Sequence, residues 1–227
     1  MSAPALGSPA SGPEAPKWRF ARFLRAVPGP LLLGAYRVRF FDTQNMPETG
    51  GFILAGNHVS YLDPAILWAG VPRETHFVAK QELFEMPVVG WGLPRVWALP
   101  INRGTADRVA IQRATDLLLQ GEPVGIFPEG TRQVPGAATE QPSEGHAGVA
   151  FIALRAGVPV VPVGIAGTER ALPKGARLPR FPRVTVRYGE PVRPEEFIQG
   201  GRKERMQAMT TEIMHRIDVA RRRAEEE

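Results

Sequence analysis

The sequence predicts an α/β fold in which a mixed, largely parallel sheet is flanked by helices. Short apolar runs, each about the length of a buried strand, alternate along the chain with segments of helical periodicity. Polar or charged residues directly follow several of these runs, as they do where ligands bind at the carboxyl ends of parallel strands. With 227 residues and 43% hydrophobic content, the chain can bury one sizeable core.

Seven segments have the composition or the alternation of strands. Residues 36–40 alternate between apolar and basic side chains, which predicts an edge strand with one face in water. Pro159 and Pro162 lack a backbone N–H, so the strand that contains them is expected at an edge or with an interrupted ladder. The expected strands are residues 36–40, 52–55, 75–79, 96–99, 124–127, 158–165 and 183–188.

Four segments are expected to be helical. Thr105 is expected to cap the second of them and Gly121 to end it. Residues 133–147, rich in Gly, Pro, Ala and polar groups, predict a mobile loop before the third. Methionine and isoleucine recur at helical spacing in the last helix, which predicts a core face. The expected helices are residues 64–70, 105–120, 149–156 and a final helix from Gly201.

The N-terminal stretch divides into two parts. Residues 1–16 consist mainly of Pro, Ala, Ser and Gly, which predicts a disordered tail. Residues 17–35 interleave aromatic and leucine side chains with arginines, and the Pro-Gly-Pro sequence at 28–30 breaks the stretch into two short pieces. We expect this amphipathic segment to lie in a membrane interface without crossing it. The alternative is a helix packed on the body of the protein with its arginines in water.

Composition restricts the partners and the compartment. The net charge of +5 favours anionic partners, namely nucleic acid, anionic lipid or phosphorylated small molecules. Because no RNA-binding signature, zinc-finger spacing or basic-zipper pattern is present, we expect no nucleic-acid partner. The absence of cysteine excludes disulfides and thiolate chemistry. No apolar stretch is long enough to span a bilayer and no secretory signal is visible, so we expect a cytoplasmic protein.

A candidate catalytic pair lies in the segment 56–64, directly after the apolar run 52–55. His58 is expected in a strand-to-helix turn, with Pro64 at the first position of the helix and Asp63 as its cap. The spacing of His58 and Asp63 does not place them on one helix face, but a turn that doubles back brings the carboxylate to the imidazole. The carboxylate would then fix the imidazole tautomer. The plainer alternative is a helix cap beside an ordinary turn histidine.

Three further candidates follow predicted strands in the same way as His58. They are Lys80, Arg103 and Glu129. If these strands are parallel neighbours, the side chains converge at one edge of the sheet.

Two motifs carry a resemblance to a known family. Asn57-His58, with Asp63 after it, and the later sequence Phe127-Pro-Glu-Gly-Thr-Arg132 together resemble the glycerolipid acyltransferase family, whose best-known members are the lysophosphatidic acid acyltransferases. Residues 79–80, 82–84 and Gly90 resemble the segment before the family's second motif, residues 100–103 that motif, and residues 148–163 its fourth, so the likeness covers roughly residues 36–190. It implies a glycerol-phosphate acyltransferase-like fold and a single acyltransferase domain over residues 36–227.

The resemblance implies transfer of a fatty acyl group from acyl-CoA or acyl carrier protein to the free hydroxyl of lysophosphatidic acid. The product would be phosphatidic acid, a precursor in phospholipid synthesis. No cofactor or metal is implied, and the expected partners are the phosphorylated lysolipid, the acyl thioester and an anionic membrane surface, with the protein peripheral on the inner face of the membrane. His58 would act as the general base, oriented by Asp63.

The substrate-binding candidates follow from the same resemblance and from the chemistry of a phosphorylated acceptor. Arginine holds phosphate through two parallel hydrogen bonds, so Arg132 is the first choice, with Arg103 and Lys80 as helpers. Glu129 would bind the glycerol part, and Gly130 allows close backbone approach. The backbone amides of Gly130 and Thr131 are candidates for stabilising the oxyanion.

Alternatives remain open at this point. Gln133 replaces a serine that many relatives carry, and residues 133–147 follow no form of the family, so another lysophospholipid, a glycolipid or an acylated amino-acid lipid is a second choice of acceptor. A metal-dependent hydrolase using His58, Asp63 and Glu129 is a third hypothesis. A non-catalytic protein that binds anionic lipid is the fourth.

Overall fold

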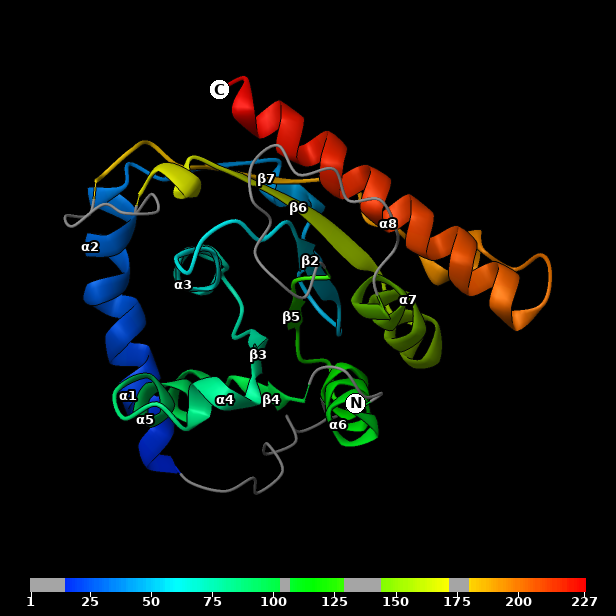
Figure 1. Ribbon diagram of the computed structural model, residues 1–227, viewed down its shortest axis with the longest axis horizontal. Helices are drawn as coiled ribbons and strands as arrows, with labels where there is room; N and C mark the ends of the chain where they lie inside the picture. Colours follow the sequence, from blue (N-terminus) through cyan, green and yellow to red (C-terminus); the bar gives the residue numbers. More distant parts are fainter. Residues whose placement is uncertain (1–14, 103–106, 129–143, 172–179) are drawn as a thin grey trace, which may run out of the picture.

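The structure, a computed structural model, describes residues 15–102, 107–128, 144–171 and 180–227 (Figure 1). The described strands form one seven-stranded sheet in the order β1-β7-β6-β2-β5-β3-β4. The strands β2 to β6 run parallel to one another, whereas β1 and β7 run in the opposite direction. The mixed, largely parallel sheet predicted from the sequence is therefore confirmed. The strands are β1 (Arg39–Phe41), β2 (Ile53–Gly56), β3 (His76–Lys80), β4 (Leu99–Ile101), β5 (Val124–Ile126), β6 (Val160–Ala166) and β7 (Thr185–Tyr188).

Helices cover both faces of this sheet (Figure 1). The described helices are α1 (Ala15–Ala26), α2 (Pro28–Ala35), α3 (Asp63–Gly70), α4 (Gln81–Phe84), α5 (Val89–Gly92), α6 (Arg108–Leu119), α7 (Glu144–Ala156) and α8 (Arg202–Glu225). Short 3-10 turns are η1 (Thr43–Asn45), η2 (Leu93–Val96), η3 (Thr168–Arg170) and η4 (Pro194–Glu196).

The strand β2 shows how the sequence pattern builds the two cores. Phe52, just before the strand, and Leu54 pack in one cluster with α3, β6 and β7, with α2 packed against it. Ile53 and Ala55 face the other way, into a second cluster with α6, α7 and α8. Because alternate side chains of a strand point to opposite faces, an all-apolar run is what a strand covered on both sides requires.

Two outcomes were expected for the strand that contains the prolines, and the edge position is wrong. The strand β6 lies inside the sheet, between β7 and β2. The carbonyl of Pro162 accepts from the N–H of Gly189, and because the N and C=O of one strand residue point to the same side, the nitrogen of Pro162 also faces β7. The β6–β7 pairing ends at the next residue, Val163, which agrees with the other expected outcome, an interrupted ladder.

Several element boundaries also differ from the sequence-based expectation. The strand expected at 96–99 begins at Leu99, because the preceding residues form α5 and η2 and Trp97 adopts a left-handed conformation (φ 58°). Asp107, and not Thr105, caps α6, since its carboxylate accepts from the N–H of Ala110. The helix α7 starts at Glu144, so residues 144–147, expected in a loop, are helical.

The N-terminal segment forms two helices that meet at Val27. Pro28 occupies the first turn of α2, where the missing N–H is harmless. Ala21 and Gly29 are fully buried, and Leu32 and Leu33 pack against the core. Among the described helices, none combines the length and the apolar character that crossing a bilayer requires.

Candidate active site

The carboxyl ends of five parallel strands meet at one edge of the sheet. His58 lies just beyond the end of β2, and Lys80 is the last residue of β3. The strands β2, β5, β3 and β4 are consecutive and parallel, which is the arrangement under which the strand-end candidates converge. The remaining candidates lie outside the described residues: Arg103, Glu129, Gly130, Thr131 and Arg132.

The turn after β2 doubles back and brings Asp63 to His58. The Nδ1 atom of His58 lies 2.9 Å from Oδ2 of Asp63. The Asp63 side chain is 0% exposed and that of His58 is 15% exposed. A carboxylate only accepts hydrogen bonds, so Nδ1 carries the proton and Nε2 is the basic nitrogen.

Asp63 does not cap α3, which corrects the expected role of this residue. Its Oδ2 atom accepts from the backbone N–H groups of Val59 (2.8 Å) and Ser60 (2.7 Å), both in the preceding turn. The carboxylate therefore closes the turn around itself. The side chain of Ser60 is also used locally, because its Oγ accepts from the N–H of Leu62 at 3.3 Å.

Thr168 supplies the fourth donor to Asp63 and was not predicted from the sequence. Its hydroxyl donates to Oδ1 of Asp63 at 2.6 Å, and the residue is fully buried. Gly167 presents it in a turn after β6 with φ 98°, where a Cβ would meet the Arg183 carbonyl oxygen at 2.2 Å. The available signal was that Thr168, like His58, follows a predicted strand.

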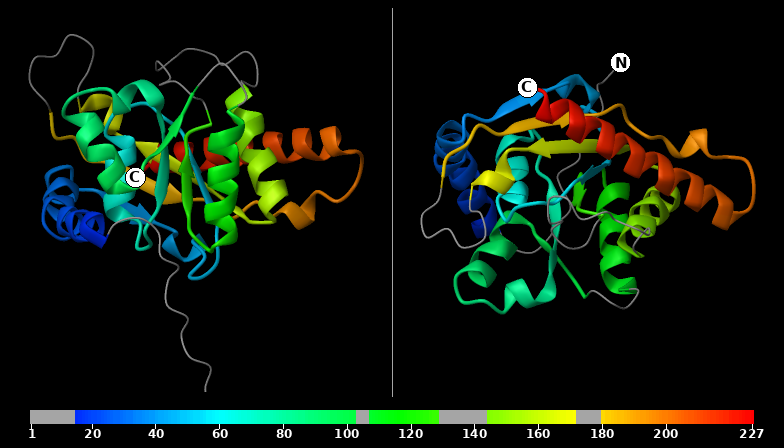
Figure 2. Two further views of the ribbon diagram at one scale, coloured as in Figure 1. Left: turned by 90° about the horizontal axis from the view of Figure 1, so that it is seen from below. Right: turned by 45° about the horizontal axis from the view of Figure 1, so that its top comes forward.

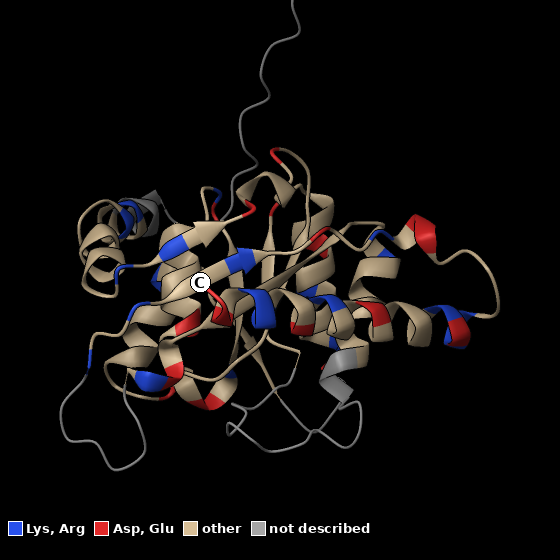
Figure 3. Cartoon of the chain, turned by 90° about the horizontal axis from the view of Figure 1, so that it is seen from above, with Lys and Arg blue, Asp and Glu red and all other residues tan. Residues whose placement is uncertain are grey.

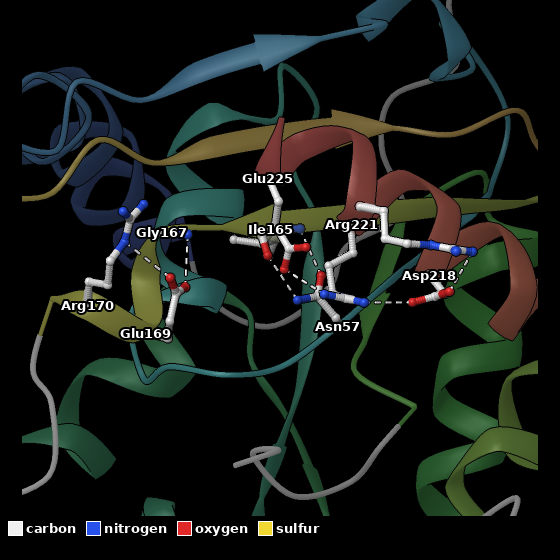
Figure 4. Close-up of polar contacts among 9 residues, drawn as sticks. Asn57, Ile165, Gly167, Glu169, Arg170, Asp218, Arg221 and Glu225 are labelled. Atoms are coloured by element: carbon white, nitrogen blue, oxygen red, sulfur yellow. Dashed lines mark hydrogen bonds and ion pairs between the residues drawn. The ribbon is translucent and has the colours of Figure 1, made fainter. Parts of the chain in front are cut away.

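Asn57 fastens the same turn to β6, a role that sequence reasoning also missed. Its side-chain amide donates to the carbonyl of Ile165 at 2.9 Å, and its oxygen accepts from the N–H of Ile165 at 2.7 Å (Figure 4). Asn57 is buried, so both bonds are shielded from water. His58 is thereby held next to the end of β6.

The imidazole of His58 rests on an aromatic ring. The ring centroids of His58 and Phe127 are 4.5 Å apart, with an angle of 28° between the planes. Phe127, at the end of β5, packs in turn near Phe77 of β3, with ring centroids 6.1 Å apart. Contact with Phe127 and the bond to Asp63 together fix both the position and the rotation of the imidazole.

A second carboxylate ties Asn102 to the start of α6. Asp107 accepts from the N–H of Asn102 and from that of Ala110, each at 2.9 Å. The N–H group of Ala110 first, and that of Asn102 second, lower the pKa of Asp107 because they stabilise its charged form. The chain on both sides of residues 103–106 is thus tied to the start of α6.

The described site offers a general base and no evident metal cluster. Across residues 15–102, 107–128, 144–171 and 180–227, no group of three or more His, Asp or Glu side chains is placed to hold a metal ion. A buried carboxylate oriented on an imidazole whose other nitrogen is basic is suited to removing a proton from a hydroxyl.

Fold and site define a class of protein: an α/β protein with a histidine–aspartate pair at the carboxyl edge of its sheet. Residues 37–166 match the family described as "Acyltransferase". The chain is 31% identical to the 1-acyl-sn-glycerol-3-phosphate acyltransferase of Bacillus subtilis over 79% of its length and 86% of that protein. The chain therefore belongs to the acyltransferase family, and the family expectation is confirmed.

Two further comparisons agree with this. The crystal structure of the 1-acyl-sn-glycerophosphate (LPA) acyltransferase PlsC from Thermotoga maritima superposes with a TM-score of 0.65 at 25% identity, over 88% of this chain and 81% of that one. The lyso-ornithine lipid O-acyltransferase of Pseudomonas aeruginosa is 32% identical over 69% of this chain, which spans 55% of that protein.

Replacing His58 tests the base. We expect His58→Gln, which keeps a polar side chain without a base, to lower acyl transfer by about a hundred- to ten-thousand-fold. The urea midpoint, measured in parallel, should stay close to that of the original protein because the glutamine amide can still donate a hydrogen bond to Asp63 in place of Nδ1. Transfer within a few-fold of normal would contradict the assignment.

Replacing Thr168 tests the support of Asp63. Thr168→Val keeps the shape but removes a hydrogen bond to a charged group, a class worth about 1.5–3 kcal/mol, so we expect kcat to fall about tenfold or more. Thr168→Ser, which retains the hydroxyl, should recover most of kcat. A lowered urea midpoint with unchanged kcat per folded molecule would show that Thr168 serves the fold alone.

Proposed function

We propose that this protein transfers a fatty acyl group from acyl-CoA or acyl carrier protein to the free hydroxyl of lysophosphatidic acid, giving phosphatidic acid. The observation that carries the proposal is the buried Asp63–His58 pair, with Nδ1 and Oδ2 2.9 Å apart, inside the segment that matches the family. The names of the Bacillus subtilis and Thermotoga maritima relatives support lysophosphatidic acid as the acceptor.

The chemistry requires no covalent enzyme intermediate. Nε2 of His58 takes the proton from the acceptor hydroxyl while the oxygen attacks the thioester carbonyl. The tetrahedral intermediate then expels the thiolate, which takes the proton back from the imidazolium. The positive charge on the ring is balanced by the Asp63 carboxylate, which itself is held by the donors from Val59, Ser60 and Thr168.

The substrate-binding roles in this proposal rest on the family motif. Arg132 holds the acceptor phosphate, with Arg103 and Lys80 as further cations, and Glu129 binds the glycerol. Gly130 and Thr131 offer backbone N–H groups to the oxyanion. Lys80 is described: it ends β3 beside Ile101 of β4, on the edge of the sheet that also carries His58.

The acceptor is the finer part of the proposal, and one relative gives a reason to test it. The Pseudomonas aeruginosa protein is named for an acylated amino-acid lipid, lyso-ornithine lipid. An ornithine headgroup offers a carboxylate in place of a phosphate, so an arginine at the acceptor site would meet a different anion. Acceptor choice and the role of Arg132 can therefore be measured together.

An acceptor panel with labelled acyl-CoA or acyl carrier protein tests the proposal. We expect lysophosphatidic acid to give the highest kcat/KM, and Arg132→Lys to raise its KM roughly tenfold, since the lysine cannot form the second charge-assisted hydrogen bond. The KM of the donor should change little. Preference for lyso-ornithine lipid, or an equal loss for donor and acceptor, would contradict the phosphate assignment.

Two controls in the same assay address the other hypotheses. Full transfer after treatment with a chelator excludes a metal-dependent hydrolase. Absence of turnover with every acceptor in the panel would favour a protein that only binds anionic lipid.

We also propose that α1 and α2 hold the protein on the inner face of the membrane. The two helices pack on the body through Leu32 and Leu33 but leave Phe23, Val27 and Leu31 exposed at a spacing of one helical turn. The sequence raised two alternatives, a membrane-interface segment and a helix packed on the body of the protein. The segment has features of both, because one part of it is packed and another part is exposed. The acceptor and the product are both lipids, so a site beside a bilayer suits the reaction.

The arginines of this segment divide in the same way. The Arg25 guanidinium donates to the carbonyl of Val71 and lies 5.7 Å from the centroid of the Trp68 ring. Burial lowers the pKa of Arg25, partly offset by the charge of Glu74, so this arginine serves the packing of α1. The side chain of Arg22 is 69% exposed and lies 3.8 Å from the carboxylate of Glu74, so it stays at the surface as one partner of an exposed ion pair.

Binding to vesicles that contain phosphatidylglycerol tests the placement of these helices. Because burying one large apolar side chain is worth about a factor of ten or more, we expect Leu31→Glu to weaken co-sedimentation by about tenfold. Ile198→Glu, at a similarly exposed residue just before α8, is the control and should bind normally. High salt should weaken binding without abolishing it. Equal pelleting of both variants and the original would contradict the proposal.

A further inference from the structure

A second apolar surface lies between α4 and α5. We call residues 86–91 the α4–α5 tip. Within the described residues, its Val88 is the most exposed of the large hydrophobic side chains, at 82%. Trp91 is 54% exposed, and Met86 and Val89 are exposed as well. The sequence of the tip, Met-Pro-Val-Val-Gly-Trp, carries no charge, so nothing in it opposes burial in lipid.

The position of the α4–α5 tip connects it to the active site. The helix α4 begins at Gln81, directly after the last residue of β3, and so lies at the edge of the sheet where β2 leads into His58. The tip is therefore part of the surface around the site, although its residues belong to no motif of the family resemblance beyond Gly90.

The α4–α5 tip also adjoins the N-terminal helices. The ring of Trp91 meets that of Phe20 in α1 edge to face, with centroids 5.3 Å apart and planes at 77°. The helix α1 contacts η2, which follows α5. Figure 2 shows α1, α2, α4 and α5 at one end of the molecule, opposite the loop that leads into α8. The apolar residues of α1–α2 and of the tip thus form neighbouring surfaces.

A cation lies directly on the aromatic ring of the α4–α5 tip. The guanidinium of Arg95 lies 4.1 Å from the centroid of the Trp91 ring and donates to the Trp91 carbonyl. An aromatic ring with a cation beside it is suited to the boundary between lipid headgroups and acyl chains. Glu82 in α4 and Glu85 at its C-terminal cap lie before the tip and are exposed.

The surface along α8 differs in its apolar content. None of the exposed large hydrophobic side chains of the described residues belongs to α8. Charged residues occur along the whole helix (Figure 3), with basic ones in the majority. Several of them form ion pairs: Arg221 bonds to Asp218 at 2.8 Å and to Glu225 at 2.5 Å, and Arg216 bonds to Glu212 at 2.6 Å. This surface therefore offers no apolar group for insertion into lipid.

We propose that the α4–α5 tip inserts into the same anionic lipid surface as α1 and α2, as a second contact beside the active site. The inference rests on the membrane placement under Proposed function and adds to it. One contact tethers the protein but leaves its tilt free. Two neighbouring contacts fix the tilt, so that the strand edge with His58 faces the lipid from which the acceptor comes.

The absence of cysteine gives a direct test, because one introduced thiol is the only site of labelling. Val88→Cys, Leu31→Cys and Ile198→Cys are each labelled with a polarity-sensitive fluorophore in the full-length protein and mixed with phosphatidylglycerol vesicles. All three positions are strongly exposed, at 82%, 70% and 72%, so the labels start from similar surroundings. We expect a blue shift and a several-fold rise in emission at positions 88 and 31, with little change at 198.

The pattern of responses separates the two proposals. A response at 31 without one at 88 overturns the second contact and leaves the placement of α1 and α2 intact. No response at 31 or 88 overturns both. A response at all three positions indicates non-specific adsorption and also overturns the second contact.

A kinetic measurement tests the consequence for orientation. We expect Val88→Glu to lower acyl transfer to an acceptor embedded in vesicles by about tenfold. Transfer to a short-chain acceptor dissolved as monomers should stay unchanged, because Val88 is not part of the catalytic site. Equal effects on the two forms of acceptor would count against a role in membrane contact.

Discussion

The site depends on one buried carboxylate. An ionised group without water must be compensated by hydrogen bonds, and Asp63 obtains four donors from two separate parts of the chain. Two are backbone groups of the turn after β2, one is the imidazole of His58, and one is the hydroxyl of Thr168 after β6. The same interactions that make burial of Asp63 tolerable fix the turn, dock it on β6 and orient the base. Stability and catalytic geometry therefore share a single network.

The sheet provides the rigid frame for this network. β2 lies between β6 and β5, with all of its residues buried, so the turn that follows has little freedom. Asn57 restricts this turn further, because its side chain forms hydrogen bonds with both the C=O and the N–H of Ile165. β7 and the edge strand β1 run opposite to β6, whereas the five parallel strands leave their carboxyl ends together for chemistry.

The two surfaces of the molecule carry different kinds of residue for a physical reason. Around the strand edge and α1–α2, apolar side chains remain exposed although the cores beneath them are well filled. Along α8, no large apolar side chain is exposed, several charges form ion pairs, and the apolar face is buried against β6 and α7. The membrane placement proposed for α1 and α2 would bury the apolar side chains that are exposed on their side of the molecule.

The sequence alone determined the elements whose signals are local: the all-apolar run of β2, the core face of α8, and the family motifs that name His58, Asp63 and the residues 129–132. Tertiary structure decided whatever depends on distant partners. Pro162 fits an interior strand because β7 ends beside it, and β4 starts late because Trp97 takes a left-handed turn. Asp63 resembles a helix cap in sequence, yet Thr168, far along the chain, is what completes its burial. Helical periodicity and strand length are set by neighbours in sequence, whereas the donors around a buried charge are chosen by packing.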